Sequence, residues 1–317
     1  MKILLTGGAG FIGFHVATAL LRRGDEVFII DNFNDYYDTN LKEDRIRFLQ
    51  KEFGEIKIAR IDIADYDALK EIFINNKFDK VCHLAAQAGV RYSLENPFIY
   101  ERTNCLGTLN LLELCRYYQV RDFVFASSSS VYGDNKDLPF SESAKIDTPI
   151  SLYAATKKSN EEMAYTYHHL FGLNCIGLRF FTVYGPWGRP DMALFKFTKN
   201  IIEDKPIEVY NNGEMSRDFS YISDVVSGVL AAMDMRAKYE IINLARGESV
   251  KLIDFIKEIE SNLGKQAKKS LMPMQAGDVP ATWADISKAR QLLNYEPKVS
   301  VKDGVKDFIN WYQEYYK

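Results

Sequence analysis

The 317-residue sequence has no long uninterrupted apolar run and no excess of positive charge. No stretch approaches the roughly 18 uncharged apolar residues of a membrane-spanning helix, so we expect no membrane contact. Lys and Arg number 40 against 43 Asp and Glu, which argues against a nucleic-acid-binding protein. The N-terminus also lacks the apolar segment and cleavage site of a signal peptide. These absences together predict a cytoplasmic protein.

Cysteine and histidine are scarce, with four of each. The cysteines show neither CxxC pairing nor metal-ligand spacing, and their apolar or helical surroundings predict buried free thiols. The histidines show no triad or metal pattern, so we assign them no role and expect no metal. These residues are Cys82, Cys105, Cys115, Cys175, His15, His83, His168 and His169.

The first two-thirds of the chain alternates short apolar runs with longer amphipathic segments. The runs are KILLTG from Lys2, EVFIID ending at Asp31, IKIARID ending at Asp62, KVCHLAA from Lys80, FVFASSS from Phe123 and CIGLRFF from Cys175. Continuous apolar strands separated by helices predict a parallel sheet that is buried on both faces. Right-handed crossovers then make this an α/β protein with a Rossmann-type doubly wound fold.

The texture changes after Phe181. TVYGPWGRPDMA, from Thr182, carries two prolines and two glycines, and it predicts an irregular loop rather than a strand. MPMQAGDVPATWAD, from Met272, predicts a second one. We expect a Rossmann domain from residues 1–181 plus about 217–245, and a smaller, discontinuous α/β substrate-binding domain at the C-terminus from about 182–216 plus 246–317.

Two further patterns are interpreted as structural. The charge run KEDRIR, from Lys42 to Arg47, predicts a solvated helix face. Trp187, Trp283 and Trp311 are expected to pack in the interior rather than to contact a cofactor.

A glycine-rich segment, TGGAGFIG, lies between the first strand and the first helix. Gly7, Gly10 and Gly13 there permit a tight turn and close approach of the backbone to a pyrophosphate, although a plain tight turn also fits. The helix N-terminus supplies free N–H groups to the phosphates. Asp31, 18 residues after Gly13, would hold ribose hydroxyls, and no Arg or Lys follows in Asn32–Phe33 for a 2′-phosphate. NAD is therefore favoured over NADP.

The end of the third strand offers a second contact to the cofactor. Asp62 and Ile63 would sit beside the adenine. For Asp62, a helix N-cap is an equally good interpretation.

Tyr153 and Lys157, in YAATK, lie four residues apart and so share one face of a helix. A tyrosine of pKa ~10 is a poor base, and lowering this pKa to about 7 requires favouring the phenolate by roughly 4 kcal/mol. The Lys157 ammonium and a positive nicotinamide ring are the expected sources. A surface pair is the alternative for YxxxK alone. FASSSSVYG favours the catalytic interpretation, because it places the hydroxyls of Ser127–Ser130 at the carboxyl end of a strand.

Eight elements of the sequence, in order, resemble the extended short-chain dehydrogenase/reductase family. They are TGGAGFIG, Asp31, HLAAQAGV, SSSSVYG, YAATK, RFFTVYGPWGRPDMA, RDFSYISD and GDVPATWAD, and they span Lys2 to Asp285. Within the family the sequence is most similar to the NAD-dependent nucleotide-sugar epimerases that act on UDP-glucuronate. The resemblance implies Tyr153 as catalytic base, Lys157 as its partner and as holder of the nicotinamide ribose, and Ser128 as the third catalytic residue.

The cofactor contacts expected from motif and resemblance together form one set. They are Gly7, Gly10, Phe11, Ile12, Gly13, Asp31, Asn32, Asp62, Ile63, Leu84, Ala85, Ala86, Tyr153 and Lys157.

The resemblance also implies the reaction, epimerisation at C4 of a UDP-sugar through a 4-keto intermediate, most closely UDP-glucuronate to UDP-galacturonate. Ser129 and Ser130 stand where dehydratases and decarboxylases of this family carry acidic residues, and these neutral hydroxyls favour plain epimerisation. Thr182 and Arg189 are expected to hold the sugar carboxylate, since a guanidinium binds a carboxylate in bidentate fashion. A loop-stabilising pair of Arg189 with Asp191 is the alternative.

The remaining substrate contacts are assigned more coarsely. We expect Arg217 at the diphosphate, Asp278 at the uridine ribose, Lys196 and Gln275 nearby, Gln87 in the sugar pocket, and Arg91 at the sugar or diphosphate. For Arg91, a C-terminal cap of a short turn fits equally well.

Other functions stay open at this point. A UDP-glucose/UDP-galactose or N-acetylhexosamine 4-epimerase is the first alternative, and a UDP-glucuronate decarboxylase the next. A non-catalytic NAD-binding protein is disfavoured, because it has no need of Ser128, Tyr153 and Lys157 together. The wide apolar stripes of 104–118 and 154–170, with the resemblance, predict a homodimer through a four-helix bundle.

Overall fold

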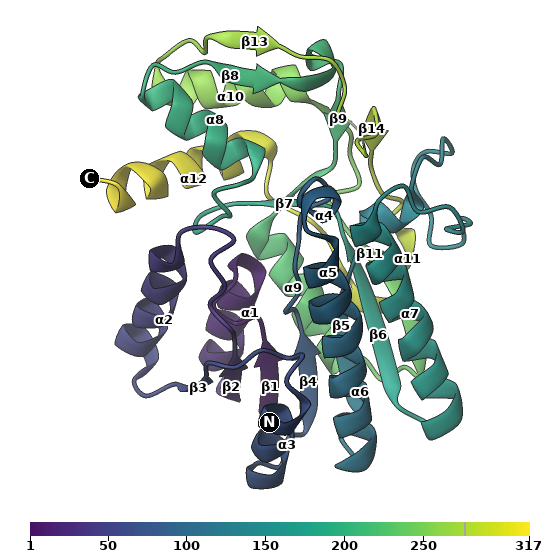
Figure 1. Ribbon diagram of the computed structural model, residues 1–317. Coiled ribbons are helices and arrows are strands. Elements are labelled where there is room, and N and C mark those ends of the chain that lie inside the picture. The colour runs from purple at the N-terminus through teal and green to yellow at the C-terminus, as the bar shows by residue number, and fades with distance from the viewer. Residues whose placement is uncertain (276) are drawn as a thin grey trace.

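The centre of the molecule is a seven-stranded parallel sheet with strand order β11-β6-β5-β4-β1-β2-β3 (Figure 1). The computed structural model describes residues 1–275 and 277–317. The strands are β1 (Lys2–Thr6), β2 (Glu26–Ile30), β3 (Lys57–Ala59), β4 (Lys80–His83), β5 (Asp122–Ser128), β6 (Asn174–Phe180) and β11 (Tyr239–Leu244). The order reverses between β1 and β4, and ligands of such sheets bind outside the strand ends at that point. The predicted doubly wound fold is confirmed.

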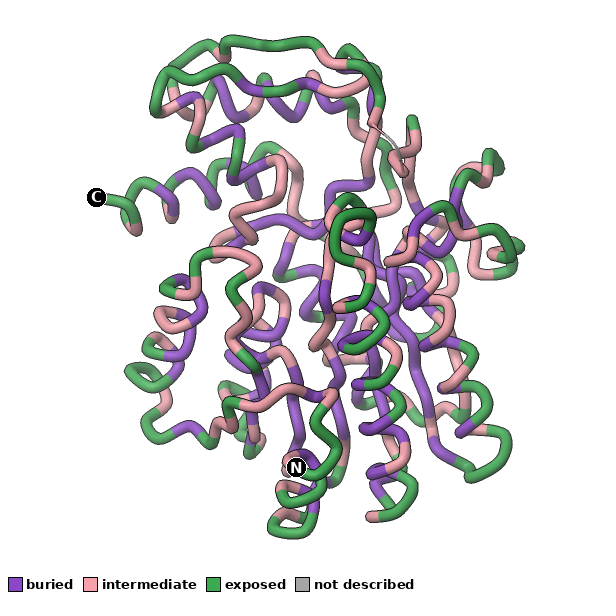
Figure 2. Tube along the Cα trace, viewed as in Figure 1, coloured by how far each residue is buried: buried purple, intermediate pink, exposed green. Residues whose placement is uncertain are grey.

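Helices cover both faces of this sheet. One face carries α1 (Phe11–Arg22), α2 (Thr39–Phe53) and α9 (Ile222–Asp234); the other carries α3 (Tyr66–Asn75), α6 (Gly107–Tyr117) and α7 (Leu152–Phe171). Successive strand residues point to opposite faces, so Ile3 and Leu5 pack in one buried cluster and Leu4 in the other. Figure 2 shows this interior as a buried band along the strands. Burial on both faces explains why the strands read as continuous apolar runs.

A second group of elements lies beyond the carboxyl ends of the strands, at the top of Figure 1. A separate apolar cluster that includes Phe195, Phe255 and Phe308 holds it together. Its elements are α8 (Ala193–Ile202), β8 (Ile207–Val209), η3 (Tyr210–Gly213), β9 (Ser216–Arg217), β12 (Val250–Lys251), α10 (Leu252–Leu263), β13 (Lys269–Leu271), β14 (Ala281–Thr282) and α12 (Val301–Tyr315). The last helix before α12, α11 (Ser287–Leu293), contacts β11 of the large sheet.

Several short elements complete the chain between the longer strands and helices. They are α4 (Tyr92–Glu95), α5 (Pro97–Tyr100), η1 (Glu101–Leu106), η2 (Ser129–Tyr132), β7 (Thr182–Tyr184) and β10 (Phe219–Tyr221). β7 pairs with β10 in parallel, with Thr182 opposite Phe219. The prediction that this stretch is only an irregular loop is therefore wrong for 182–184, because a distant segment supplies the pairing strand. Ala276, inside the second predicted loop, lies outside the described residues.

The charge run in α2 also differs from its prediction. Lys42 and Arg45 are buried, with 5% and 0% of their surface exposed, rather than part of a solvated face. The reason is a tertiary contact, because Arg45 donates a hydrogen bond to the carbonyl of Ala9 in the glycine-rich loop, and Lys42 donates to Asn34. Charged residues on one side of α2 thus face the ends of β1 and β2.

The free thiols follow the prediction in part. Cys82, Cys115 and Cys175 are buried, whereas Cys105 is half-buried. Within residues 1–275 and 277–317, no helix is both long and apolar enough to span a membrane.

Candidate active site

Two adjoining cavities lie at the carboxyl ends of the strands, one of about 900 Å³ and one of about 230 Å³. The smaller is lined by the glycine-rich loop and by the ends of β2, β4 and β5. The larger extends toward α8, β9 and β14. Both are lined by Tyr36, Ser128, Tyr153, Phe180, Phe181, Arg189 and Met192. The predicted catalytic hydroxyls of Ser128 and Tyr153 therefore lie where the cavities meet.

The glycine-rich loop is closed so tightly that side chains are excluded. A Cβ atom on Gly13 would lie 2.0 Å from the carbonyl oxygen of Gly7, and Gly7 itself has φ of +74°. Helix α1 starts at Phe11, and its N-cap, Gly10, supplies no side-chain hydrogen bond. The first N–H groups of α1 thus remain for an anion at the helix N-terminus. Gly7, Gly10, Phe11, Ile12 and Gly13 all line the smaller cavity.

Asp31, directly after β2, faces the same cavity. It is 8% exposed and accepts hydrogen bonds from the N–H groups of Ala9, at 3.1 Å, and Phe33, at 2.8 Å. Burial raises the pKa of Asp31, and these two hydrogen bonds act against that rise. The other predicted cofactor residues lining this cavity are Asn32, Ile63, Leu84, Ala85, Ala86, Tyr153 and Lys157.

Asp62 is placed differently from the other predicted cofactor residues. It is not among the residues lining either cavity; its carboxylate accepts from the Ala64 N–H at 2.9 Å and lies 3.7 Å from the Arg102 guanidinium. The N-cap of α3 is Asp65, which accepts from the Ala68 N–H at 3.1 Å. The N-cap interpretation therefore belongs to Asp65, and Asp62 closes the turn before it.

Lys42 is a cavity residue that the sequence analysis missed. It lines the smaller cavity with Asp31, and its Nζ donates to the carbonyl oxygen and to Oδ1 of Asn34, at 2.6 and 2.8 Å. Burial lowers the pKa of Lys42, while the charge of Asp31 acts in the opposite direction. The premise that no lysine stands near the ribose position was therefore incomplete, since Lys42 arrives from the next helix rather than from the residues after Asp31.

Helix α7 places Tyr153 and Lys157 one turn apart. Ser151 caps its N-terminus by accepting from the Ala154 N–H at 3.1 Å. Lys157 Nζ donates to the carbonyl of Ala126 at 2.8 Å, and burial lowers the pKa of Lys157 to about 8. Burial raises the pKa of Tyr153, although a hydrogen bond with Ser128 and the charge of Arg189 act against this rise. The lowered phenol pKa stays a prediction for the cofactor-bound enzyme.

The serine cluster forms a short hydrogen-bonded turn at the end of β5. Ser128 is the N-cap of η2, and the Oγ of Ser128 accepts two hydrogen bonds from Ser130, one from the backbone N–H at 3.2 Å and one from the hydroxyl at 2.9 Å. Ser129 and Ser130 line the larger cavity beside Ser128. Three neutral hydroxyls thus face the space next to Tyr153.

Asn104 holds the backbone next to this site, and no pattern in the sequence indicates it. The helical segment from α5 to α6 includes η1, a π-helical turn, and such wide turns often occur at functional sites. Asn104 is fully buried within it, exchanges hydrogen bonds with the backbone of Gln87 at 2.8 and 3.0 Å, and donates to Thr156 at 3.0 Å. Gln87 lines the smaller cavity, and its contact to the sugar stays a prediction.

Arg189 and Asp191 form a bidentate ion pair inside the larger cavity. Arg189 Nε and Nη2 donate to the two carboxylate oxygens at 2.9 and 2.5 Å, and the hydroxyl of Tyr36 donates to the same carboxylate at 3.1 Å. Burial acts to raise the pKa of Asp191, but the charge and hydrogen bonds of Arg189 hold it below its usual value. The alternative proposed from sequence, a loop pair, is thus present, and among the described residues Nη1 takes part in no hydrogen bond. Thr182 lines the same cavity.

The far end of the larger cavity carries the residues predicted for the nucleotide. Arg91 Nη2 lies 2.7 Å from Asp278 Oδ2, and its guanidinium stacks on the ring of Tyr210 at 4.5 Å. Arg91 precedes α4 at its N-terminus, so its interpretation as a C-terminal cap is wrong. Lys196 and Arg217 line this cavity too, whereas Gln275 is not among the residues lining it. Burial lowers the pKa of Arg217.

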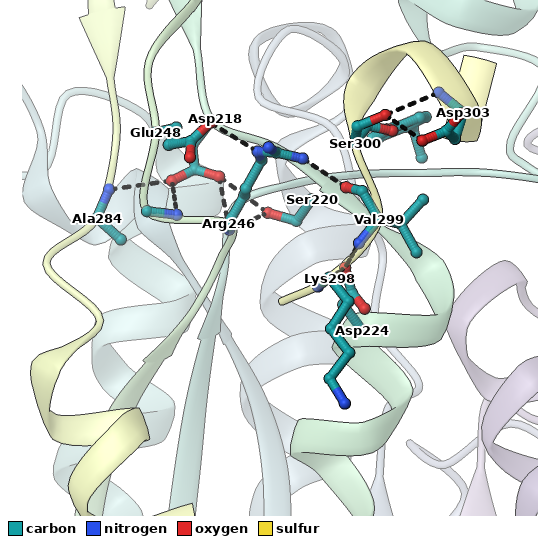
Figure 3. A network of polar contacts seen from close by, with 12 residues as sticks. Asp218, Ser220, Asp224, Arg246, Glu248, Ala284, Lys298, Val299, Ser300 and Asp303 are labelled. Atoms are coloured by element: carbon teal, nitrogen blue, oxygen red, sulfur yellow. Dashed lines mark hydrogen bonds and ion pairs between the residues drawn. The ribbon is translucent and has the colours of Figure 1, made fainter. Parts of the chain in front are cut away.

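Asp218 fixes the backbone next to Arg217 (Figure 3). Its buried carboxylate accepts from the N–H groups of Arg246, Gly247 and Ala284 at 2.8, 2.9 and 3.3 Å, and from the hydroxyl of Ser220 at 3.1 Å. Its own carbonyl accepts from the N–H of Thr182 at 3.1 Å. Burial raises the pKa of Asp218 to about 6 against these hydrogen bonds. One residue thereby ties together the segments that carry Arg217 and Thr182.

Comparison with known proteins gives a consistent picture. Residues 4–308 match the family model described as GDP-mannose 4,6 dehydratase. The chain is 48% identical to UDP-glucuronate 4-epimerase of Thermodesulfobacterium geofontis over 312 residues, which cover 98% of this chain and 96% of that protein. A solved structure of Bacillus cereus UDP-glucuronic acid 4-epimerase with UDP-glucuronic acid and NAD is 38% identical, with a TM-score of 0.92 over 100% of both chains. Thermotoga maritima UDP-glucose 4-epimerase with UDP-glucose is 31% identical, with a TM-score of 0.91 over 100% of both.

Proposed function

Because the chain belongs to the family described as GDP-mannose 4,6 dehydratase, within the extended short-chain dehydrogenases/reductases, we propose that it interconverts UDP-glucuronate and UDP-galacturonate. The reaction is NAD-dependent epimerisation at C4. The observation that carries this proposal is the meeting of the two cavities at Ser128, Tyr153 and Arg189. A base, a hydroxyl and a cation thus adjoin both the cofactor side and the sugar side of one site.

The smaller cavity fits NAD. Its glycine-rich loop has no room for side chains and leaves the first N–H groups of α1 for a pyrophosphate, while the Asp31 carboxylate with Lys42 beside it suits ribose hydroxyls. Lys157 would hold the nicotinamide ribose. When bound, NAD supplies the oxidising power at C4 and restores the hydride to the same carbon. The other cofactor contacts predicted from the sequence line this cavity and are proposed to contact NAD. Asp62 does not line it, and its proposed role is to shape the turn before α3.

Tyr153 carries the proton. As a phenolate it removes the proton of the C4 hydroxyl while C4 becomes a ketone, and it returns that proton when C4 is reduced from the other face. Lys157, held at the Ala126 carbonyl, stabilises the phenolate by its positive charge. Ser128 hydrogen-bonds the sugar oxygen beside it. Between the two halves the flat 4-keto sugar turns over, so the configuration at C4 is reversed.

The sugar carboxylate needs its own restraint. With a carboxylate at C6, the 4-keto sugar is a β-keto acid that loses CO2 easily, so an epimerase must hold that group. Thr182 and Nη1 of Arg189 are the groups proposed for this role, since both residues line the larger cavity and Nη1 takes no part in the pair with Asp191. Ser129 and Ser130 offer hydroxyls and no acid for elimination of water. The site therefore favours epimerisation over dehydration or decarboxylation.

The UDP part of the substrate occupies the far end of the larger cavity. Arg217 contacts the diphosphate, and Asp278 contacts the uridine ribose once its pair with Arg91 opens. Lys196 and Gln275 contribute at the rim. In this arrangement residues 182–216 and 246–317 form the nucleotide-sugar-binding domain, and residues 1–181 and 217–245 form the NAD-binding domain.

We further propose a cytoplasmic homodimer. Phe98 is 87% exposed, and Leu106 and Leu109, on the adjoining η1 and α6, are 40% and 37% exposed. These helices lie beside α7 in Figure 1, so two copies would pair them as four helices. Sedimentation as a monomer at micromolar concentration would contradict the dimer.

Incubation with UDP-glucuronate tests the proposed reaction. The purified protein, loaded with NAD, is mixed with UDP-glucuronate, and the nucleotide sugars are separated by chromatography. UDP-galacturonate is expected without UDP-xylose. Unchanged substrate, or release of CO2 with formation of a UDP-pentose, would overturn the proposal.

UDP-glucose 4-epimerase activity is the second candidate. It is favoured by one observation, namely that the charge of Arg189 is already neutralised by Asp191, so that the cavity is suited to a neutral sugar as well. The same assay with UDP-glucose decides between them. A higher kcat/KM for UDP-glucose than for UDP-glucuronate would make this the main activity.

A further inference from the structure

The loop that carries Arg189 is held by two side chains from the cofactor-binding part of the chain. Nε2 of His15, on α1, lies 2.9 Å from the carbonyl oxygen of Pro186. Arg45, on α2, donates through Nη2 to the carbonyl of Trp187 at 2.6 Å. Only Gly188 separates Trp187 from Arg189. Two consecutive carbonyls, two and three residues before the proposed carboxylate-binding residue, are therefore fixed from outside the loop.

The protonation state of His15 is determined by its surroundings. A carbonyl oxygen only accepts, so Nε2 carries the hydrogen of this contact. Burial lowers the pKa of His15 to about 4, with the charge of Arg45 adding to that effect and the bond to Pro186 opposing it. His15 is thus a neutral donor near neutral pH.

Trp187 has a backbone conformation that needs support. Its φ is +60°, in the left-handed region that is unfavourable for bulky residues. Its ring packs against those of Phe14, Phe48, Trp311 and Tyr315, with centroids 5.2 to 6.0 Å apart. The hydrogen bond from Arg45 fixes the carbonyl, and the rings fix the side chain, so the turn before Arg189 is defined from both sides.

Arg45 is an unusual residue to find in this position. It is fully buried, and besides Trp187 it donates to the carbonyl of Ala9 and to the hydroxyl of Tyr37, both at 2.8 Å. Among the described residues, its Nε has no hydrogen-bond partner and its guanidinium donates only to uncharged oxygens, although its charge acts to lower the pKa of the nearby Asp31 carboxylate. A buried cation whose hydrogen bonds all go to uncharged acceptors is costly. Its three acceptors lie on the glycine-rich loop, on the loop after β2 and on the loop before Arg189.

We propose that Arg45 and His15 are positioning residues for uronate recognition, acting through the carbonyls of Trp187 and Pro186 to set the place of the Arg189 guanidinium. This inference rests on the proposed function, because it concerns the sugar carboxylate. Arg217, proposed to contact the diphosphate, lies on β9, and its guanidinium donates to the carbonyls of Ser216 and Pro280 rather than to residues 186–189. Loss of the positioning residues should therefore weaken binding of the uronate and spare binding of UDP.

The test compares Arg45→Met with Arg47→Met in the NAD-loaded enzyme. Arg47 lies on the same helix and pairs with Asp44 at the surface, where it is 66% exposed, so its variant controls for removal of a cation from α2. Calorimetry gives the dissociation constants for UDP-glucuronate and for UDP. For Arg45→Met we expect about tenfold weaker binding of UDP-glucuronate, which corresponds to the loss of one charge-assisted contact. The dissociation constant for UDP should stay within about twofold of its original value. Equal losses for both ligands, or no loss, would overturn the proposal.

A second pair of variants decides the matter even if Arg45→Met does not fold. His15→Phe keeps a ring between Phe11 and Phe14, whose centroids lie 5.6 and 4.9 Å away, but removes the donor. His15→Gln keeps a donor. We expect about threefold weaker binding of UDP-glucuronate for His15→Phe, as for one neutral hydrogen bond, and recovery in His15→Gln, with UDP unaffected in both. Two variants that behave alike would contradict the proposal.

The unmodified enzyme separates this inference from the proposed function. Binding of UDP-glucuronate without epimerisation would overturn the function and leave the positioning of Arg189 to be measured as above. Binding of UDP-glucuronate no tighter than that of UDP would show that Arg189 does not hold the carboxylate, and would overturn the inference itself.

Discussion

Arg189 and Asp191 face each other edge to edge, with two hydrogen bonds of 2.9 and 2.5 Å, at the end of the larger cavity that adjoins the smaller one. The phenol of Tyr36 donates to the same carboxylate, which fixes the pair from the cofactor side. A sugar carboxylate arriving there meets a cation that is already neutralised. Such a pair can offer a hydrogen bond with little net Coulombic attraction, and a moderate grip suits a sugar that must turn over before it is reduced.

Replacing Asp191 separates its charge from its positioning role. Asp191→Asn keeps an acceptor for Arg189 but no longer neutralises the Arg189 charge, so we expect KM for UDP-glucuronate to fall by about fivefold. We expect kcat to fall as well, because the more tightly held intermediate turns over more slowly. Asp191→Ala leaves Arg189 unoriented, and KM should rise. Steady-state kinetics on both variants measures this contrast. KM values that move in the same direction would show that the charge of Asp191 has no separate effect.

Tyr153→Phe should remove turnover while NAD stays bound. Loss of a general base typically costs a factor of about 10² to 10⁴, and we expect kcat to fall within or beyond that range. The phenyl ring fills the same space, so cofactor content per subunit should be unchanged. Tyr165→Phe is the control, since Tyr165 lies on the same helix and is 51% exposed. Retained activity in Tyr153→Phe would remove its role as base.

Arg189 and Arg217 should differ in the ligands that they discriminate. Arg217→Met is expected to weaken the binding of UDP-glucuronate and of UDP-glucose to the same extent, by about tenfold or more, because both ligands carry the diphosphate. Arg189→Met should weaken UDP-glucuronate alone. Competition binding against UDP on each variant gives both numbers. If Arg217→Met weakened the binding of UDP-glucuronate alone, Arg217 rather than Arg189 would be the residue that binds the sugar carboxylate.

His83 makes stability depend on acidity. It is buried between the hydroxyls of Thr6 and Thr108, at 2.8 and 3.0 Å, and burial lowers its pKa to about 3. The unfolded chain takes up the proton near pH 6.5 and the folded one does not, so stability is lost as pH falls below about 6.5. Asp218, with its raised pKa, acts with the opposite sign but is the same in both proteins compared below.

The comparison is between the unmodified protein and His83→Gln. Urea unfolding at pH 6.5 and pH 4.5 gives the free energy of unfolding of each. The unmodified protein should lose roughly 2 kcal/mol more than His83→Gln between these two pH values. Parallel pH dependences would mean that His83 is not held neutral in the folded state.

Local sequence patterns were enough to predict the central sheet and the main motifs of the site. The strands were predictable because each is a continuous apolar run buried on both faces, as with Leu4 and Leu5 of β1. The glycine-rich loop, Asp31, Tyr153 and Lys157 were predictable because each is defined by spacing within one segment or at one strand end. Their common placement around adjoining cavities follows from the sheet, whose carboxyl ends all lie on one edge.

Residues whose role depends on distant segments were not predictable. Lys42 and Arg45 belong to a charge run typical of a solvated face, and only the packing of α2 on the glycine-rich loop buries them. Asn104 lies in a π-helical turn that no local pattern indicates. Strand β7 forms because β10 pairs with it, and β10 lies more than thirty residues later in the chain. Each of these depends on a tertiary partner that the local sequence does not name.

The central claim is that the hydride removed from C4 stays in the active site and is returned to the same carbon on its other face. The most direct measurement uses UDP-glucuronate carrying deuterium at C4, incubated with the NAD-loaded enzyme in ordinary water, with the product analysed by mass spectrometry and NMR. We predict UDP-galacturonate that keeps the deuterium at C4. Deuterium lost to solvent, or a product lacking a carbon as CO2, would contradict the account.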